Sequence, residues 1–128
     1  MTTIFLTGDR SMNPLLAVQV AGQLVFEIAA SNAIASLAGA EPIAIATGDN
    51  AGFERAVRDV LEGLGATPTV VPTGVNPDTD KPAWDTRHEV VNALADRVVF
   101  VHTDPLSSSL GASLMKVCGD KVELPSFS

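Results

Sequence analysis

The sequence has little cysteine, little histidine and few aromatic residues. Its 128 residues include one cysteine and two histidines, tyrosine is absent, and aromatic residues make up 5% of the chain. A single cysteine, Cys118, excludes a disulfide within the chain and a cysteine-rich zinc site. The shortage of aromatic rings leaves few platforms on which single-stranded nucleic acid stacks. We therefore expect neither a metal nor a bound cofactor.

Positive charge is also scarce. Eight Lys and Arg residues face fifteen Asp and Glu, which gives a net charge of −7. Non-specific binding to nucleic acid needs a basic surface, and so does docking on anionic lipid. We therefore expect neither as a partner. The first residues lack the basic segment of a secretory signal, so the expected location is the cytoplasm.

One long apolar stretch, Pro14 to Ala40, carries Glu27 as its only charge. Its length would span a bilayer, but a carboxylate in the middle of a membrane costs about 2.5–3.5 kcal/mol. We predict instead a buried or interface helix from Pro14 to Leu37, with a candidate break at Ser31-Asn32. A helix that is apolar on every side needs cover on every side, so the stretch also predicts a homodimer formed through this helix.

Short apolar strands alternate with helices along the rest of the chain. The expected strands are Thr3–Thr7, Pro42–Ala46, Thr67–Val71, Val98–Val101 and Lys121–Leu124. The further expected helices are Phe53–Leu64, Trp84–Ala95 and Ser107–Val117. This alternation predicts one Rossmann-like three-layer α/β domain over residues 1–128. We expect a mostly parallel five-stranded sheet with helices on both faces.

Small and polar residues gather in the loops that follow the expected strands. Ligands of open parallel sheets bind beyond the carboxyl ends of the strands. Glycine lets backbone N–H groups come close to a ligand, and helix N-termini favour anions. The predicted ligand-binding residues are Gly8, Asp9, Arg10, Ser11, Thr47, Gly48, Asp49, Asn50, Gly52, Arg87, Asp104, Ser107, Ser108, Ser109 and Gly111.

The individual roles of these residues stay open at this level. Arg10 directly follows a strand end and a glycine, so it is either a clamp for phosphate or carboxylate, or a salt-bridge partner of Asp9 or Asp49. The two aspartates either hold ribose hydroxyls or cap helices. Trp84 is expected to anchor the packing, with stacking on a ligand base as the alternative.

Three motifs carry a resemblance to a known family. They are Ile4-Phe5-Leu6-Thr7-Gly8-Asp9-Arg10-Ser11, then Gly48-x-x-x-Gly52-x-Glu54, and finally Arg87 to Val101 followed by Ser109-Leu110-Gly111-Ala112. In their order and spacing they resemble the SMF/DprA–LOG (SLOG) superfamily of Rossmann-like domains, especially its small YspA-like branch. The resemblance implies a pocket for a nucleotide or nucleotide-derived ligand at the loops already named.

Three functions remain in view. The first is binding of a nucleotide-type small molecule by a sensor, sequestering, accessory or phage protein. The second is N-glycosidic hydrolysis or transfer on nucleotides, with Glu54 or Glu89 as candidate catalytic carboxylates. The hydrolases of the superfamily carry Pro-Gly-Gly-x-Gly-Thr-x-x-Glu, and the corresponding stretch, Asp104 to Ser113, lacks the double glycine and the glutamate. The third is a pure protein-interaction module with a degenerate pocket.

Overall fold

Strands and helices alternate through the computed structural model, which describes residues 2–102, 104 and 108–125. The strands are β1 (Thr3–Gly8), β2 (Ala44–Gly48), β3 (Thr69–Val71), β4 (Arg97–Val101) and β5 (Val122–Glu123). The helices are α1 (Pro14–Leu37), α2 (Phe53–Gly63), α3 (Trp84–Leu94) and α4 (Ser109–Cys118), and a short 3₁₀ turn, η1 (Gly119–Lys121), precedes β5.

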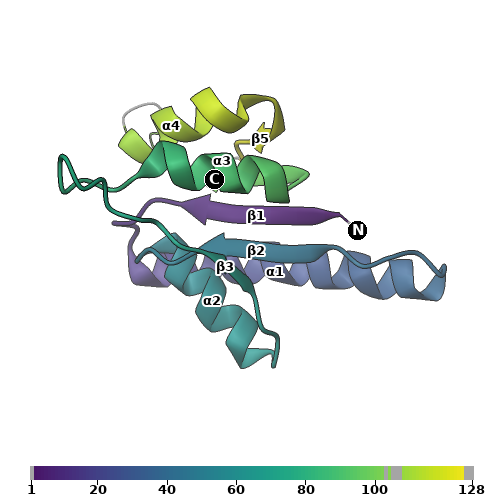
Figure 1. Cartoon of the computed structure of the whole chain (residues 1–128). Coiled ribbons are helices and arrows are strands. Elements are labelled where there is room, and N and C mark those ends of the chain that lie inside the picture. The colour runs from purple at the N-terminus through teal and green to yellow at the C-terminus, as the bar shows by residue number, and fades with distance from the viewer. Residues whose placement is uncertain (1, 103, 105–107, 126–128) are drawn as a thin grey trace.

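The five strands form one sheet in the order β3-β2-β1-β4-β5, and every neighbouring pair is parallel. Helices α1 and α2 cover one face of the sheet, whereas α3 and α4 cover the other (Figure 1). This is the predicted Rossmann-like α/β class, with a fully parallel sheet where a mostly parallel one was expected. The strand order reverses between β1 and β4, the two central neighbours.

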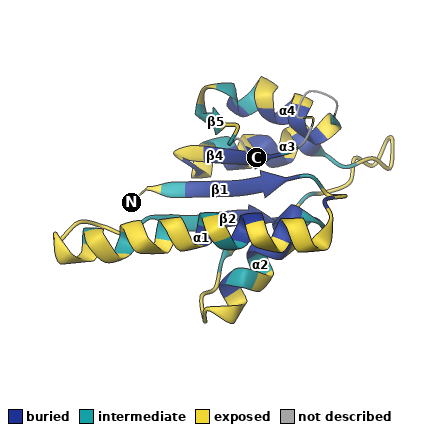
Figure 2. Cartoon of the chain, turned by 180° about the vertical axis from the view of Figure 1, so that it is seen from behind, coloured by how far each residue is buried: buried dark blue, intermediate teal, exposed yellow. Residues whose placement is uncertain are grey.

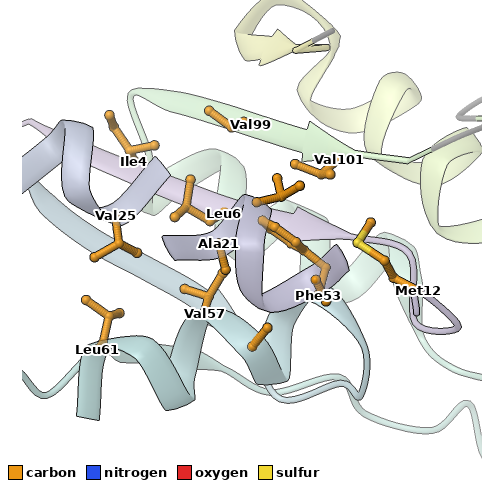
Figure 3. Close-up of a cluster of buried hydrophobic side chains, with 13 residues drawn as sticks. Ile4, Leu6, Met12, Ala21, Val25, Phe53, Val57, Leu61, Val99 and Val101 are labelled. Carbon is orange, nitrogen blue, oxygen red and sulfur yellow. The ribbon is translucent and has the colours of Figure 1, made fainter. Parts of the chain in front are cut away.

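The central strand β1 supplies both hydrophobic cores because its side chains alternate between the faces of the sheet. Ile4 and Leu6 pack with residues of α1 and α2, including Val25 and Phe53 (Figure 3). Phe5 points to the other face and belongs to the core formed with α3 and α4. Burial of this kind of side chain is worth about 1.5–3 kcal/mol each.

Helix α1 begins where the sequence predicts and does not break where a break was expected. Asn13 caps it, because its Oδ1 accepts the N–H groups of Leu15 at 3.0 Å and Leu16 at 3.3 Å. The helix continues through Ser31-Asn32 to Leu37, so the candidate break is wrong. The Asn32 side chain instead holds the backbone of Ile43, accepting its N–H at 2.6 Å and donating to its carbonyl at 2.9 Å.

The buried face of α3 differs from the one that its sequence suggests. The apolar residues Val90 and Leu94 are exposed, whereas Arg87 and His88 are fully buried. Both polar side chains lie in line with the buried Val91 along the helix, so position on the helix decides their burial. Hydrophobicity alone predicts the burial of Val91 but not that of its polar neighbours, which have hydrogen-bond partners in other elements.

Most of α1 lies outside the core. Its four buried residues, Ala17, Val20, Ala21 and Val25, pack on the domain, and the outward side is exposed over most of the helix's length (Figure 2). By length and composition alone α1 is able to cross a membrane. In the fold it is the connection between β1 and β2 and a part of the core.

Candidate functional site

A cleft of about 220 Å³ lies at the carboxyl ends of β1 and β4. At this point the chain leaves β1 toward one face of the sheet and β4 toward the other, which is where ligands of open parallel sheets bind. The cleft is lined by Gly8, Asp9, Arg10, Ser11, His102, Ser108, Ser109 and Leu110. Six of these eight residues were predicted from the sequence as ligand-binding.

Arg10 supplies the positive charge of this cleft. Its guanidinium carbon lies 5.0 Å from the centre of the Trp84 ring, and the residue is exposed to solvent. Within the described part of the chain, no carboxylate forms an ion pair with it. The predicted alternative, a salt bridge to Asp9 or Asp49, is therefore not what holds Arg10 in place. A stacking contact orients a guanidinium and leaves its N–H groups directed outward.

Two of the three aspartates of the predicted site, Asp9 and Asp49, accept backbone N–H groups in loops. Asp9 Oδ1 accepts the N–H of Ser11 at 2.8 Å and lies 3.9 Å from Nε2 of His102. Asp49 Oδ1 accepts the N–H of Thr73 at 2.9 Å. Asp9 lines the cleft, whereas Asp49 belongs to the turn after β2 and does not.

The first turn of α4 forms one wall of the cleft. Ser108 caps the helix, because its Oγ accepts the N–H of Gly111 at 2.8 Å. The backbone N–H groups of Ser109 and Leu110 lie at the start of the helix and have no acceptor within it. They add partial positive charge that favours an anion. The predicted residue Ser107 lies outside the described residues.

His102 closes the cleft at the end of β4. Its Nδ1 accepts the backbone N–H of Asp104 at 2.8 Å, and its ring packs beside that of Phe100 with the ring centres 5.6 Å apart. Asp104 itself is exposed and does not line the cleft.

A second polar cluster joins the ends of β1, β2 and β3 around a buried ion pair between Arg87 and Glu54. Arg87 Nη2 donates to Glu54 Oε2 at 2.6 Å and Nη1 donates to Oε1 at 3.1 Å. The guanidinium also donates to the hydroxyls of Thr7 at 3.0 Å and Thr73 at 2.9 Å. Neither side chain of the pair is exposed to solvent. Arg87 therefore lies inside the protein. The expectation that it lines one cleft together with Arg10 is wrong.

The carboxylate of Glu54 is fully occupied by donors from this chain. Besides Arg87, it accepts the Thr7 hydroxyl at 2.6 Å, the Asn50 backbone N–H at 3.0 Å and the Asn50 side-chain amide at 2.9 Å. Because Glu54 is also buried and does not line the cleft, its carboxylate does not reach a ligand bound there. Glu89, the other candidate for catalysis, is exposed on α3 and does not line the cleft.

The glycine-rich turn after β2 is shaped by the same ion pair. A Cβ on Gly48 would collide with the carboxylate of Glu54 and the guanidinium of Arg87. Gly52 has a φ of +70° and lies against the backbone of Asp9 and Arg10, where a side chain has no space. Both glycines therefore have a structural role. Contact of Thr47, Gly48, Asp49, Asn50 or Gly52 with a ligand stays a prediction.

A hydrogen-bonded chain between α3 and α4 was not expected from the sequence. Lys116 Nζ donates to Asp85 at 2.6 Å, Asp85 accepts the Ser113 hydroxyl, and that hydroxyl lies 2.9 Å from Nδ1 of His88. Burial, and secondarily the charge of Arg87, lower the pKa of His88 to about 4. Hydrogen bonds from Lys116 and Ser113 lower the pKa of Asp85.

The spacing of these residues in the sequence is the feature from which the hydrogen-bonded chain could have been predicted. Asp85 and His88 lie three apart on α3, and Ser113 and Lys116 lie three apart on α4. Each pair therefore shares one side of its helix. The spacing has meaning only once the two helices are known to pack together.

An open groove of about 880 Å³ lies beside the cleft, between the loop 74–83 and the starts of α3 and α4. Trp84 and Asp85 line it, and Ser109 lines both the groove and the cleft. The two hollows are therefore adjacent. Among the described residues, no group of three or more His, Cys, Asp or Glu side chains is placed to hold a metal ion.

Fold and site together define a small Rossmann-like α/β domain with a cleft at the point where its strand order reverses. The chain matches no protein-family model, no curated protein and no solved structure.

Proposed function

We propose that this protein binds a nucleotide or a nucleotide-derived small molecule in the cleft between β1 and β4, and that it acts as a sensor, sequestering or accessory protein. The observation that carries the proposal is Arg10. Its guanidinium is exposed, is oriented by the Trp84 ring and lines the cleft. A charged side chain placed in this way is suited to a phosphate or carboxylate.

The neighbouring groups match the rest of such a ligand. The first-turn amides of α4 and the hydroxyls of Ser108 and Ser109 are donors for phosphate oxygens. The Asp9 carboxylate, which uses Oδ1 for the Ser11 N–H, accepts hydroxyl groups of a ribose through Oδ2. The adjacent groove, with the Trp84 side chain on its wall, has the volume for a base.

Binding without turnover is the form of the proposal that the geometry favours. Glycosidic cleavage needs a carboxylate near the anomeric carbon. Glu54 is buried and fully hydrogen-bonded, and Glu89 does not line the cleft. Kinship with the YspA-like branch of the SMF/DprA–LOG superfamily remains part of this proposal, supported by the coincidence of its first and third motifs with two walls of the cleft.

The test is calorimetric titration with nucleoside monophosphates, with inorganic phosphate and the free nucleosides as separate arms. Arg10→Ala is expected to weaken binding of the nucleotide by roughly tenfold to a hundredfold, because it removes one charge-assisted contact. Its melting temperature is expected to stay within a few degrees of the parent. Arg55→Ala is the control, because Arg55 is an exposed arginine outside this cleft that pairs only weakly with Asp59, at 3.8 Å.

Each outcome decides between the functions. Nucleotide binding that Arg10→Ala leaves unchanged would place the ligand elsewhere and overturn the proposal. A failure of every nucleotide, phosphate and nucleoside to bind would favour a pure interaction module. Release of free base, followed by chromatography, would establish a glycosidase, and its survival in Glu54→Gln and Glu89→Gln would exclude both carboxylates as catalytic residues.

A further inference from the structure

The outward face of α1 carries large apolar side chains that remain exposed in the described part of the chain. Phe26 is 73% exposed and Leu37 is 91% exposed. The exposed large apolar residues of the helix are Leu15, Leu16, Val18, Phe26, Ile34 and Leu37. Glu27 is the only charged residue along all 24 residues of the helix. An apolar face of this extent on a small domain marks a contact surface.

Four of the other five side chains form two pairs spaced equally on either side of Phe26; Leu16 has Ser36 in the matching position. Leu15 lies eleven residues before Phe26 and Leu37 lies eleven residues after it. Val18 and Ile34 lie eight residues before and eight after. Across a two-fold axis, a residue i that contacts residue j of the copy is matched by j contacting i. Apolar residues spaced equally on either side of Phe26 therefore come together when two such helices pair antiparallel about it.

We propose that α1 packs against α1 of a second copy of this chain, antiparallel, with the two-fold axis beside Phe26. In this arrangement Leu15 comes level with Leu37 of the second copy, and Val18 comes level with Ile34. Gly22 and Ala30, four residues on either side of Phe26, also come level and allow the two helices to approach closely. None of these interface residues lines the cleft proposed for the ligand.

The chemistry of the face favours a second copy over a lipid surface. Helices that lie on membranes carry Lys and Arg on their polar side, and α1 has neither. The chain's net charge of −7 opposes docking on anionic lipid as well. A nearly uncharged face allows two copies of such an acidic chain to meet without strong repulsion.

The extent of the face is also suitable. From Leu15 to Leu37 it is about 33 Å long and about 10 Å wide, a footprint of roughly 330 Å². The side chains stand out from the helix, so the accessible area is larger than this footprint. The face therefore supplies at least about half of the roughly 600 Å² per partner that a small specific interface buries.

The first test is the mass of the protein in solution by light scattering. The parent chain is expected to show twice the 13.3 kDa of one copy at micromolar concentration. Phe26→Glu, which brings two like charges together at the axis, is expected to shift the mass to that of one copy. Val90→Glu is the control, because Val90 is exposed on α3 at the opposite side of the sheet and its substitution is expected to leave the dimer intact.

The second test checks the register with a short bis-maleimide crosslinker. Phe26→Cys is expected to crosslink to its own copy in high yield. Leu15→Cys is not, because two copies of residue 15 lie about 33 Å apart in this arrangement. A mixture of Leu15→Cys and Leu37→Cys chains is expected to give the mixed product. The parent chain is the background control, since its one cysteine, Cys118, is buried.

The opposite results overturn the proposal. A parent chain that stays monomeric from micromolar to millimolar concentration excludes the dimer. A dimer in which Phe26→Cys does not crosslink excludes this face or this register. A parent chain that is monomeric and floats with neutral phosphatidylcholine vesicles, together with a Phe26→Glu variant that does not float, would assign the face to lipid instead.

Discussion

The Arg87 guanidinium and the Glu54 carboxylate form a two-pronged ion pair from which solvent is excluded. The pair links the first turn of α2 to α3, and through Thr7 and Thr73 it also joins β1 to the loop after β3. Removal of one charge from a buried pair leaves the other without compensation. The pair therefore holds together the elements that meet at the edge of the sheet next to the cleft.

We expect Glu54→Gln to destabilise the fold by about 3–5 kcal/mol, because the buried charge of Arg87 then has no counter-ion. For a domain of this size that corresponds to a fall in melting temperature of roughly 10–20 °C. Thermal unfolding followed by circular dichroism measures it. Glu89→Gln, at an exposed position on α3, is the matched control and is expected to change the free energy of unfolding by less than about 0.5 kcal/mol. Equal effects of the two substitutions would show that the pair contributes little.

Gly48→Ala is expected to be strongly destabilising although it adds one methyl group. The new Cβ would occupy the space of the Glu54 carboxylate and the Arg87 guanidinium, so the ion pair must move or separate. The cost is expected to be in the range of about 1–3 kcal/mol or more, as for overpacking of a core. Gly63→Ala is the control: open space surrounds Gly63 in α2, so alanine is expected to be neutral or stabilising. Urea unfolding of both variants distinguishes a steric effect from a general preference for glycine.

Acid is expected to weaken the fold through His88. The pKa of His88 is lowered in the fold to about 4 from 6.5, so the unfolded chain takes up the proton first as the pH falls. The contribution of neutral His88 to the free energy of unfolding is therefore fully present above pH 6.5. It decreases as the pH falls toward 4, by up to about 3 kcal/mol. The Asp85 carboxyl, whose pKa is lowered from 3.8, adds its own loss only below that window.

Unfolding experiments between pH 7 and pH 4 measure this loss, and His88→Leu is expected to reduce it, because leucine binds no proton in either state. Titration of the two histidines by NMR gives an independent reading. A resonance of His88 that titrates near 6.5 in the folded protein would contradict the expectation.

Asn32→Ala is expected to loosen the junction between α1 and β2. It removes two hydrogen bonds to the backbone of Ile43, each worth about 0.5–1.5 kcal/mol, for a total of about 1–3 kcal/mol. Ser31→Ala changes the exposed neighbour on the same helix and is expected to be nearly neutral. Hydrogen exchange at the amide of Ile43 localises the effect. Unchanged protection of that amide in Asn32→Ala would contradict the assignment.

Much of the fold followed from local patterns in the sequence. The strand at Thr3 begins where an apolar run begins, and α1 begins at Pro14 after an asparagine cap. These features depend on neighbours along the chain, so they can be read without the structure. The strand ends also predicted most of the cleft, because the carboxyl ends of parallel strands share one edge.

The roles of the polar side chains could not be predicted from local patterns in the sequence. Arg10 and Arg87 looked alike as candidate ligand contacts, yet one lies exposed on the cleft and the other is buried against Glu54. Likewise, Gly48 resembled part of a phosphate-binding turn, whereas the structure leaves no space for a side chain there because of the same ion pair.

The sequence by itself determined the alternation of elements, the parallel sheet and the loops that meet at its edge, since these depend on hydrophobic periodicity and on backbone preferences of nearby residues. Only the tertiary structure decided which charges are buried and which are free. The partner of Arg87 lies 33 residues away in the chain, and that of Ser113 lies 28 residues away, so each pairing exists only after α2, α3 and α4 have packed on the sheet. The free energy of a charge depends on whether packing removes it from water and what then faces it.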